Sequence, residues 1–182
     1  MIRKLIFSIV LLHMVLGCAG PAQEQAKKTA PPQITEPVQE QVINPAQAQI
    51  RKGNILLNQG QWDEAVAAFN KAIELDRESA AAYYGRGNVF HFKKEFDKAI
   101  DDFNKAIDLD PKHTAAYSAR GYAYIGKGDN DKAIDDFNKA IDLHPNYLDA
   151  FYKRSVVYLE QGNKESGCSD AQKACDLGNC AI

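Results

Sequence analysis

Apolar residues recur at helical spacing through the second half of the chain. In residues 96–109 they form one stripe, made of Ala99, Ile100, Phe103, Ala106, Ile107 and Leu109. This spacing predicts an amphipathic helix that buries one face. Asp110 precedes Pro111, and the residue before a proline disfavours helical backbone, so we expect the helix to end there.

The same stripe returns after 34 residues, from Asp97 to Asp131. Residues 96–111 and 130–145 differ only at the first residue and at the residue before the final proline, and the segment FNKAI occurs a third time at 69–73. A second helical stretch precedes each copy, such as AAAYYGRGNVFHF at 80–92. The chain is therefore predicted to contain four helix–turn–helix units, at 46–79, 80–113, 114–147 and 148–182.

Repeated helix pairs indicate a stacked scaffold rather than a reaction centre. A pair of short helices buries its apolar face only against the next pair, so the repeat needs copies in register. A catalytic site needs one set of groups in one place and gains nothing from copies. We expect an all-α fold, an α-solenoid of about four helix–turn–helix repeats.

The repeated residues resemble the motif of the tetratricopeptide repeat (TPR) family. The second unit carries the motif at Tyr83, Gly87, Phe90, Ala99, Phe103, Ala106 and Pro111. The third unit carries it at Tyr117, Gly121, Tyr124, Ala133, Phe137, Ala140 and Pro145. The first unit keeps Gly53, Ala65, Phe69 and Ala72 and has Arg77 in place of the proline. The resemblance implies a right-handed superhelix with the small residues and phenylalanines in its core.

In this family the first helix of each unit lines a concave groove that holds a peptide or a partner helix. By resemblance, the groove of this chain is lined by Ile50, Asn54, Leu57, Tyr84, Asn88, His91, Phe92, Ser118, Tyr122, Ile125, Tyr152, Val156 and Leu159. The aromatic residues among them belong to the class that dominates binding hot spots. Two interpretations stay open: the aromatics bind a partner, or several of them pack on neighbouring first helices.

Some family members clamp a terminal carboxylate with asparagines and basic residues on successive first helices. Asn54 and Asn88 resemble the asparagines of that clamp. Ile50, Ser118 and Tyr122, however, stand where the basic residues belong. We therefore expect no carboxylate clamp in this chain.

A basic residue also recurs every 34 residues, at Lys52, Arg86, Arg120 and Arg154. One interpretation is a basic ladder that binds an acidic ligand. The other is structural pairing with carboxylates on the adjacent helix, such as Asp102 and Asp136. A periodic charge in a repeat favours the structural interpretation.

The first residues depart from the repeat pattern. Arg3 and Lys4 precede an apolar run at 5–16, which is too short to span a membrane and is typical of a secretory signal. The run ends in VLGC at 15–18, which resembles the lipobox of bacterial lipoproteins. That resemblance implies a signal peptide at 1–17, lipidation of Cys18, and anchoring to a lipid bilayer of the bacterial cell envelope. Because no aspartate follows Cys18, we expect the outer membrane, facing the periplasm.

Residues 18–45 are predicted to be a flexible linker. The segment holds most of the prolines of the chain, among Gln, Glu, Lys and Ala, and it has no helical stripe. Such a composition cannot bury enough surface to offset its ordering entropy. The linker either gives the repeats reach from the membrane or is a spacer without a function of its own.

The fourth unit ends in small residues and cysteines. Ser166, Gly167 and Ala171 stand where the other units have larger or better helix-forming residues. Cys168 and Cys175 lie seven residues apart on one helix, too far to form a disulfide. Gly178 can reverse the chain and bring Cys180 back towards Cys175, or less easily towards Cys168. We expect a Cys175–Cys180 disulfide and a buried Cys168.

These observations favour a non-catalytic adaptor that is anchored by lipid and holds another protein in its groove. The alternative is a structural component that self-assembles, as a homo-oligomer through the fourth unit, in an envelope complex such as a pilus or outer-membrane assembly. An enzyme is least favoured, because the chain lacks catalytic motifs, and we expect no catalytic residues and no cofactor. We expect no metal site, since the cysteines form no CxxC pair, and no nucleic-acid partner, since the net charge is −2.

Overall fold

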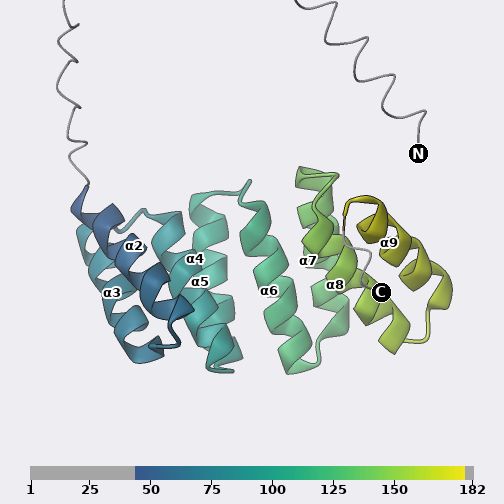
Figure 1. Ribbon diagram of the computed structural model, residues 1–182, viewed down its shortest axis with the longest axis horizontal. Coiled ribbons are helices and arrows are strands. Elements are labelled where there is room, and N and C mark those ends of the chain that lie inside the picture. The colour runs from purple at the N-terminus through teal and green to yellow at the C-terminus, as the bar shows by residue number, and fades with distance from the viewer. Residues whose placement is uncertain (1–43, 179–182) are drawn as a thin grey trace, which may run out of the picture. The chain divides into compact units, whose positions relative to one another are not determined.

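The computed structural model describes residues 44–178, which form a row of helix pairs (Figure 1). The pairs are α2 (Pro45–Asn58) with α3 (Trp62–Leu75), α4 (Ala80–Phe92) with α5 (Phe96–Leu109), α6 (Thr114–Lys127) with α7 (Asn130–Leu143), and α8 (Leu148–Glu160) with α9 (Lys164–Asp176). The helices α4, α6 and α8 begin at the first residues of the second, third and fourth expected units. The predicted all-α solenoid is confirmed.

The signal peptide at 1–17, the lipidated Cys18 and nearly all of the 18–45 linker lie outside the described residues. The end of the expected linker differs from the prediction, because Pro45 is the first residue of α2. The side chain of Asn44 caps this helix by accepting a hydrogen bond from the Ala46 N–H at 2.9 Å. Proline suits the first helical position, where a backbone N–H would have no partner within the helix.

The helices are arranged so that the first helix of each pair lies on the inner side of the row. Each second helix packs on the first helix of its own unit, and α3, α5 and α7 also pack on the first helix of the next unit. The first helices also contact one another, α2 with α4, α4 with α6 and α6 with α8. Within residues 44–178 no two second helices touch. The first helices are therefore crowded on a concave side, and the second helices spread on the convex side.

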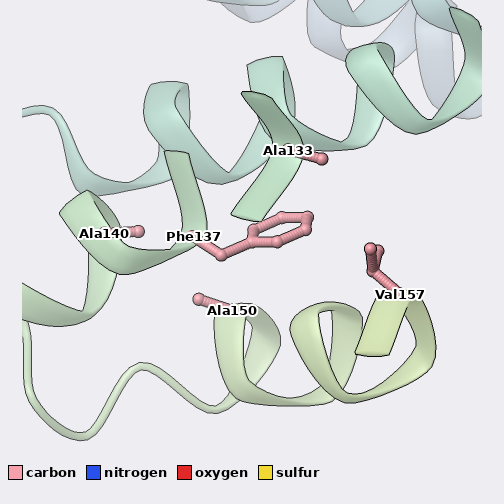
Figure 2. Close-up of a cluster of buried hydrophobic side chains, with 5 residues drawn as sticks. All are labelled: Ala133, Phe137, Ala140, Ala150 and Val157. Atoms are coloured by element: carbon pink, nitrogen blue, oxygen red, sulfur yellow. The ribbon is translucent and has the colours of Figure 1, made fainter. Parts of the chain in front are cut away.

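One phenylalanine from a second helix fills the interior between successive units. Phe137 on α7 has no exposed surface and packs with Ala133 and Ala140 of the same helix. From the other side, Ala150 and Val157 of α8 close over the ring (Figure 2). Burial of an aromatic ring and its aliphatic neighbours stabilises the contact between units.

A glycine on the first helix makes room for each of these rings. A Cβ atom added to Gly87 would lie 2.7 Å from Cε1 of Phe103, and one added to Gly121 would lie 2.9 Å from Cε1 of Phe137. Carbon atoms do not approach so closely, so any side chain here would push the ring away. The glycines and phenylalanines predicted to form the core do so as matched pairs.

The fourth unit changes both members of this pair. Ser155 stands at the glycine position of α8, and Ala171 stands at the phenylalanine position of α9. The small alanine leaves the space that the serine Cβ needs, and Ser155 is buried with its Oγ donating to the Tyr152 carbonyl at 2.7 Å. The last interior of the stack is therefore smaller than the others.

The cysteines of α9 differ from expectation at one position. Cys168 is exposed, so the prediction that it is buried is wrong. The buried stripe of α9 is made of Gly167, Asp170 and Ala174, and Cys168 lies one residue round the helix from it. Cys175 is disulfide-bonded and Cys168 is a free thiol. Cys180 lies outside the described residues, so the Cys175–Cys180 pairing stays a prediction.

Candidate functional site

The inner side of α4, α6 and α8 is hollowed. Hollows of about 190, 370 and 290 Å³ open along these helices, and Tyr122 of α6 lines all three. We call this continuous surface the inner groove. Of the residues expected to line a groove, it contains Tyr84, Asn88, His91, Phe92, Tyr122, Ile125, Tyr152 and Val156.

The aromatic side chains of the inner groove divide into exposed and packed residues. Phe92, Tyr122 and Tyr152 are 57%, 45% and 40% exposed. Tyr84 is half-buried, with its ring centroid 4.8 Å from that of His113 and 6.0 Å from that of Phe103. Each of the two interpretations of the groove aromatics is therefore correct for some of them. Tyr84 packs within the stack, and the other three side chains are exposed and can contact a partner.

Ser118 was expected on the same surface, and the structure corrects this. It is 1% exposed, and its Oγ donates a hydrogen bond to Oδ2 of Asp149 on α8 at 2.7 Å. Tyr84 and Tyr152 occupy the same place in the neighbouring units, but the shorter serine is covered by the adjacent first helix. Ser118 therefore joins α6 to α8 and cannot touch a ligand.

Four other expected residues do not line the three hollows. Ile50 and Leu57 pack against the core of the first unit. Leu159 lies over Gly167, whose added Cβ would be 2.6 Å from the Leu159 Cγ. Asn54 is exposed on α2. The hollowed part of the concave side therefore begins at α4.

The inner groove also contains residues that the sequence did not single out. Lys153 on α8 places its Nζ 3.0 Å from Oδ2 of Asp149 and 4.6 Å from the centroid of the Tyr122 ring. Lys153 stands where the second and third units have Gly85 and Ala119 and the first unit has Arg51. This departure from the neighbouring units could have identified Lys153 from the sequence. The remaining additions are Lys94, Phe96, Ala115, Ala119, Gly126, Tyr147, Asp149 and Glu160.

The charges of the inner groove nearly cancel, because Lys94 and Lys153 are matched in number by Asp149 and Glu160. Burial lowers the pKa of His91 below its usual 6.5, and the charge of Lys153 lowers it further, so the imidazole is neutral at pH 7. Burial also raises the pKa of Tyr147 to about 12, with help from Asp149, so its hydroxyl stays protonated. The charge of Lys153 is balanced by Asp149. Such a surface suits apolar and aromatic ligand groups better than charged ones.

His91 is also part of the aromatic wall. Its ring centroid lies 4.8 Å from that of Tyr122 and 5.6 Å from that of Phe96. These contacts link α4, α6 and the start of α5, because the three rings come from different helices. The rings are thereby held in place before any ligand arrives, which reduces the ordering cost of binding.

The recurring arginines are structural. Arg86 donates from Nε and Nη2 to both carboxylate oxygens of Asp102, at 2.8 and 2.7 Å, and from Nη1 to Asn70 of the preceding unit at 2.6 Å. The same fork joins Arg120 to Asp136 and Asn104, and Arg154 to Asp170 and Asn138. The predicted pairing is confirmed, and a basic ladder for an acidic ligand is not formed.

The first unit has no such fork. Lys52 stands at the arginine position, but Ala68 replaces the aspartate. Lys52 is exposed. A lysine without a paired carboxylate remains hydrated on the surface, which explains why the first unit tolerates the change.

Residues 44–178 contain neither a candidate metal site nor a membrane-spanning helix. No group of histidine, cysteine, aspartate and glutamate side chains in this part of the chain could hold a metal ion. None of the helices in the same range is long and apolar enough to cross a bilayer.

Comparisons with known proteins agree with this geometry. Models of the tetratricopeptide repeat match residues 50–114 and 103–135, and a TPR repeat model matches residues 121–162. Among solved structures, a crystal structure of MamA is similar with a TM-score of 0.67 and 28% identity, over 74% of this chain and 78% of that one. A comparison with curated proteins gives no match.

Two similar structures are TPR domains from other proteins. The first TPR of Spaghetti (RPAP3), bound to the HSP90 peptide SRMEEVD, has a TM-score of 0.63 and 27% identity, over 66% of this chain and 95% of that one. The Arabidopsis OM64 TPR domain has a TM-score of 0.63 and 28% identity, over 65% of this chain and 98% of that one.

Proposed function

Because the chain is built of tetratricopeptide repeats over residues 50–162, we propose that it is a non-catalytic adaptor that binds another protein in the inner groove. The observation that carries the proposal is the exposed aromatic surface of Phe92, Tyr122 and Tyr152 along one continuous hollow. Large aromatic side chains in a concave site are the usual anchors of protein interfaces. The ligand is a peptide segment or a helix, since the hollow follows three parallel-running first helices.

The chemistry of the inner groove favours a partner with apolar side chains. RPAP3 was solved with the acidic peptide SRMEEVD. In this chain Ser118 is buried, Tyr122 stands at a position expected to be basic in a carboxylate clamp, and Lys153 is paired with Asp149. No free cation of the α8 wall therefore faces a ligand carboxylate. We propose a leucine- or aromatic-rich segment as the ligand.

Replacing Tyr122 with alanine is expected to weaken partner binding at least tenfold, because Tyr122 lines all three hollows. Folding should be unaffected, since the side chain is 45% exposed. A photo-reactive residue at Tyr122, introduced in intact cells, would capture the partner for identification by mass spectrometry. The dissociation constant of the purified pair would then be measured for both chains by calorimetry.

Ala67 gives the matched control. It is exposed on α3, and so are its equivalents Asp101, Asp135 and Ser169, so this position faces solvent on the convex side in every unit. A photo-reactive residue at Ala67 should not capture the same protein. Equal capture from both positions, equal binding by the Tyr122→Ala chain, or tight binding of SRMEEVD would argue against an apolar ligand in the inner groove.

We also propose that the adaptor is anchored by lipid at the bacterial cell envelope. The support is the sequence alone: an apolar run at 5–16 that ends in VLGC. Cys18→Ser is expected to abolish incorporation of labelled palmitate and to move the chain from the membrane fraction to the soluble fraction. Cys168→Ser, at an exposed free cysteine, should change neither property. A Cys18→Ser chain that stays lipid-labelled in the membrane fraction would contradict the anchor.

A further inference from the structure

The outer face of α2 resembles an interface without its partner. Ile55 on α2 is 57% exposed, whereas Val89, Ala123 and Val157, at the same place in the next units, have no exposed surface. Those three are covered by the second helix of the preceding unit, as Val89 is by Phe69 of α3. In the described part of the chain no helix precedes α2. Its outer face therefore has the form of a surface that receives a second helix.

The outer face of α9 has the complementary form. Cys168 and Ala171 stand at the positions that Ile134 and Phe137 occupy on α7. On α7 these positions belong to the cluster that packs with Val157 of α8. No first helix follows α9 within residues 44–178, and Cys168 is exposed. The second helix that would continue the row is therefore present, and its outer face is open.

We propose that copies of this chain associate head to tail, with α9 of one copy seated on α2 of the next in the register of the repeat. Ile55 of one copy then lies against Cys168 and Ala171 of the other, as Val157 lies with Ile134 and Phe137. The occupant of the α2 face is a second copy, because α9 of this chain carries the repeat positions that pack on such a face inside the stack.

The sizes of the side chains at the two ends support the match. α9 has the small Ala171 where α7 has Phe137, so a first helix seated on α9 must supply more volume. α2 has Ile55, which is larger than the valines and the alanine at the same position of α4, α6 and α8. Close packing favours a conserved summed volume, and here Ile55, together with the Ser155 side chain, offsets part of the loss from phenylalanine to alanine.

The polar groups at the two ends also match. Inside the stack, Arg120 donates to Asn104 of the preceding unit at 2.6 Å. At the ends, Lys52 holds the arginine position and Gln172 holds the asparagine position. The Gln172 amide nitrogen donates to Asp176 at 2.8 Å, which leaves its carbonyl oxygen to accept from Lys52 of another copy.

A second polar pair falls at the rim of the same contact. Lys93 bonds to Asp63 of the preceding unit at 2.6 Å, and Gln161 bonds to Asp131 at 3.4 Å. Across the contact between two copies, the next pair in this 34-residue series is Gln59 of one copy and Glu165 of the other. The Gln59 amide is a donor and the Glu165 carboxylate is an acceptor. The two ends of the stack thus carry apolar and polar side chains at the same repeat positions that meet between units inside the stack.

The association is heterologous, because two different surfaces meet. Such a contact builds a ring if the rotation between copies closes, and an open filament if it does not. It leaves the inner groove free, since the two end faces are not part of the three hollows. Self-association and partner binding can therefore be tested separately.

The test uses the full chain in intact cells and its native thiol. Ile55→Cys places a second thiol opposite Cys168 of the next copy. On mild oxidation with copper phenanthroline, this chain is expected to form disulfide-linked dimers and longer species on a non-reducing gel. Mass spectrometry should identify a peptide that joins position 55 to Cys168. Folding is not at risk, because Ile55 is largely exposed in the single copy.

Two control chains make the outcome decisive. Ala67→Cys presents a thiol on the convex side and is expected to give no linked species. Ile55→Cys combined with Cys168→Ser should lose the ladder. A linked dimer that persists without Cys168 would mean that two α2 faces meet symmetrically and would overturn the proposal. So would the absence of any link between position 55 and Cys168, including the case in which residues before 44 cover α2.

A charge at the same position gives an independent measurement. Ile55→Glu is expected to weaken self-association, measured by sedimentation of the purified full chain in detergent, at least about tenfold, because an unpaired carboxylate would be buried at the contact. Ala67→Glu adds the same charge on the convex side and should leave the association unchanged. Equal association of both variants and the unmodified chain, or a chain that is monomeric at every concentration, would refute head-to-tail contact.

Discussion

Replacing Phe103 with alanine is expected to lower the free energy of unfolding by about 3–5 kcal/mol. The ring has no exposed surface and lies between units, with Ala99 and Ala123 in its cluster and Gly87 against its edge. Helices on both sides are held by further units, so they cannot collapse into the cavity. Urea-induced unfolding followed by circular dichroism would measure the loss.

The chain offers controls for this substitution. Phe92→Ala makes the same chemical change at a side chain that is 57% exposed, and we expect a loss below about 0.5 kcal/mol. Gly87→Ser should destabilise the chain when Phe103 is present, and much less when position 103 is alanine, because the pair then matches Ser155 and Ala171 of the fourth unit. Equal losses from Phe103→Ala and Phe92→Ala would contradict the packing described above.

Replacing Arg120 with alanine is expected to cost about 3–5 kcal/mol at neutral pH. The substitution removes the two hydrogen bonds to Asp136, at 2.9 and 2.6 Å, and the one to Asn104. Asp136 is 5% exposed and would keep a buried charge without a cation. Thermal and urea unfolding at several pH values would measure the effect.

The loss should depend on pH in a defined direction. Burial raises the pKa of the Asp136 carboxyl in the folded chain, and Arg120 partly offsets this effect. Without Arg120 the folded pKa rises further above the unfolded value. Stability is then retained below the unfolded pKa and is lost as the pH rises through the folded pKa. The deficit of the Arg120→Ala chain is therefore largest near neutral pH and shrinks on acidification.

Lys52→Ala is the matched control for Arg120→Ala. Lys52 stands at the same position of the first unit, where Ala68 replaces the aspartate, and it is exposed. We expect a change within about 0.5 kcal/mol and no added pH dependence. If the two substitutions cost the same, or if the deficit of Arg120→Ala grew towards acid pH, the fork would not have the role assigned to it.

The fold could be predicted from the sequence because its determinants repeat. The stripe formed by Ala99, Phe103 and Ala106 returns with the same residues in the first and third units, so these copies support the same prediction. The pairing of Arg86 with Asp102 could be anticipated for the same reason. Where the repeat holds, the local environment of one unit predicts that of the next.

The candidate site was predicted less completely because it depends on departures from the repeat. Ser118 was assigned to the groove by its position, but its burial depends on Asp149, which the next first helix brings. Lys153 was overlooked because the two units before it have glycine and alanine at this position, which have no side chain long enough to reach a neighbouring ring. Cys168 was assigned to the wrong side of α9 because one residue turns a helix by about a quarter of its circumference.

The inner groove also shows why position alone does not give accessibility. Tyr84 and Tyr152 hold the same place in the second and fourth units, yet Tyr84 packs on His113 while Tyr152 is 40% exposed. The difference arises from the neighbours that follow each helix. Periodicity therefore identifies which face is concave, and the individual neighbours decide which side chains remain free.

The near identity of α5 and α7 has a consequence for how the gene can change. Apart from the first residue, Phe96 in α5 and Asn130 in α7, both helices present the same residues to the helices before and after them. Each helix can therefore pack on nearly the same neighbouring surfaces as the other. An in-frame duplication or deletion of one 34-residue segment, from 96 to 129 for example, would join surfaces that already fit. Recombination between the two copies could thus lengthen or shorten the binding surface by one module while the buried core of each remaining junction is kept.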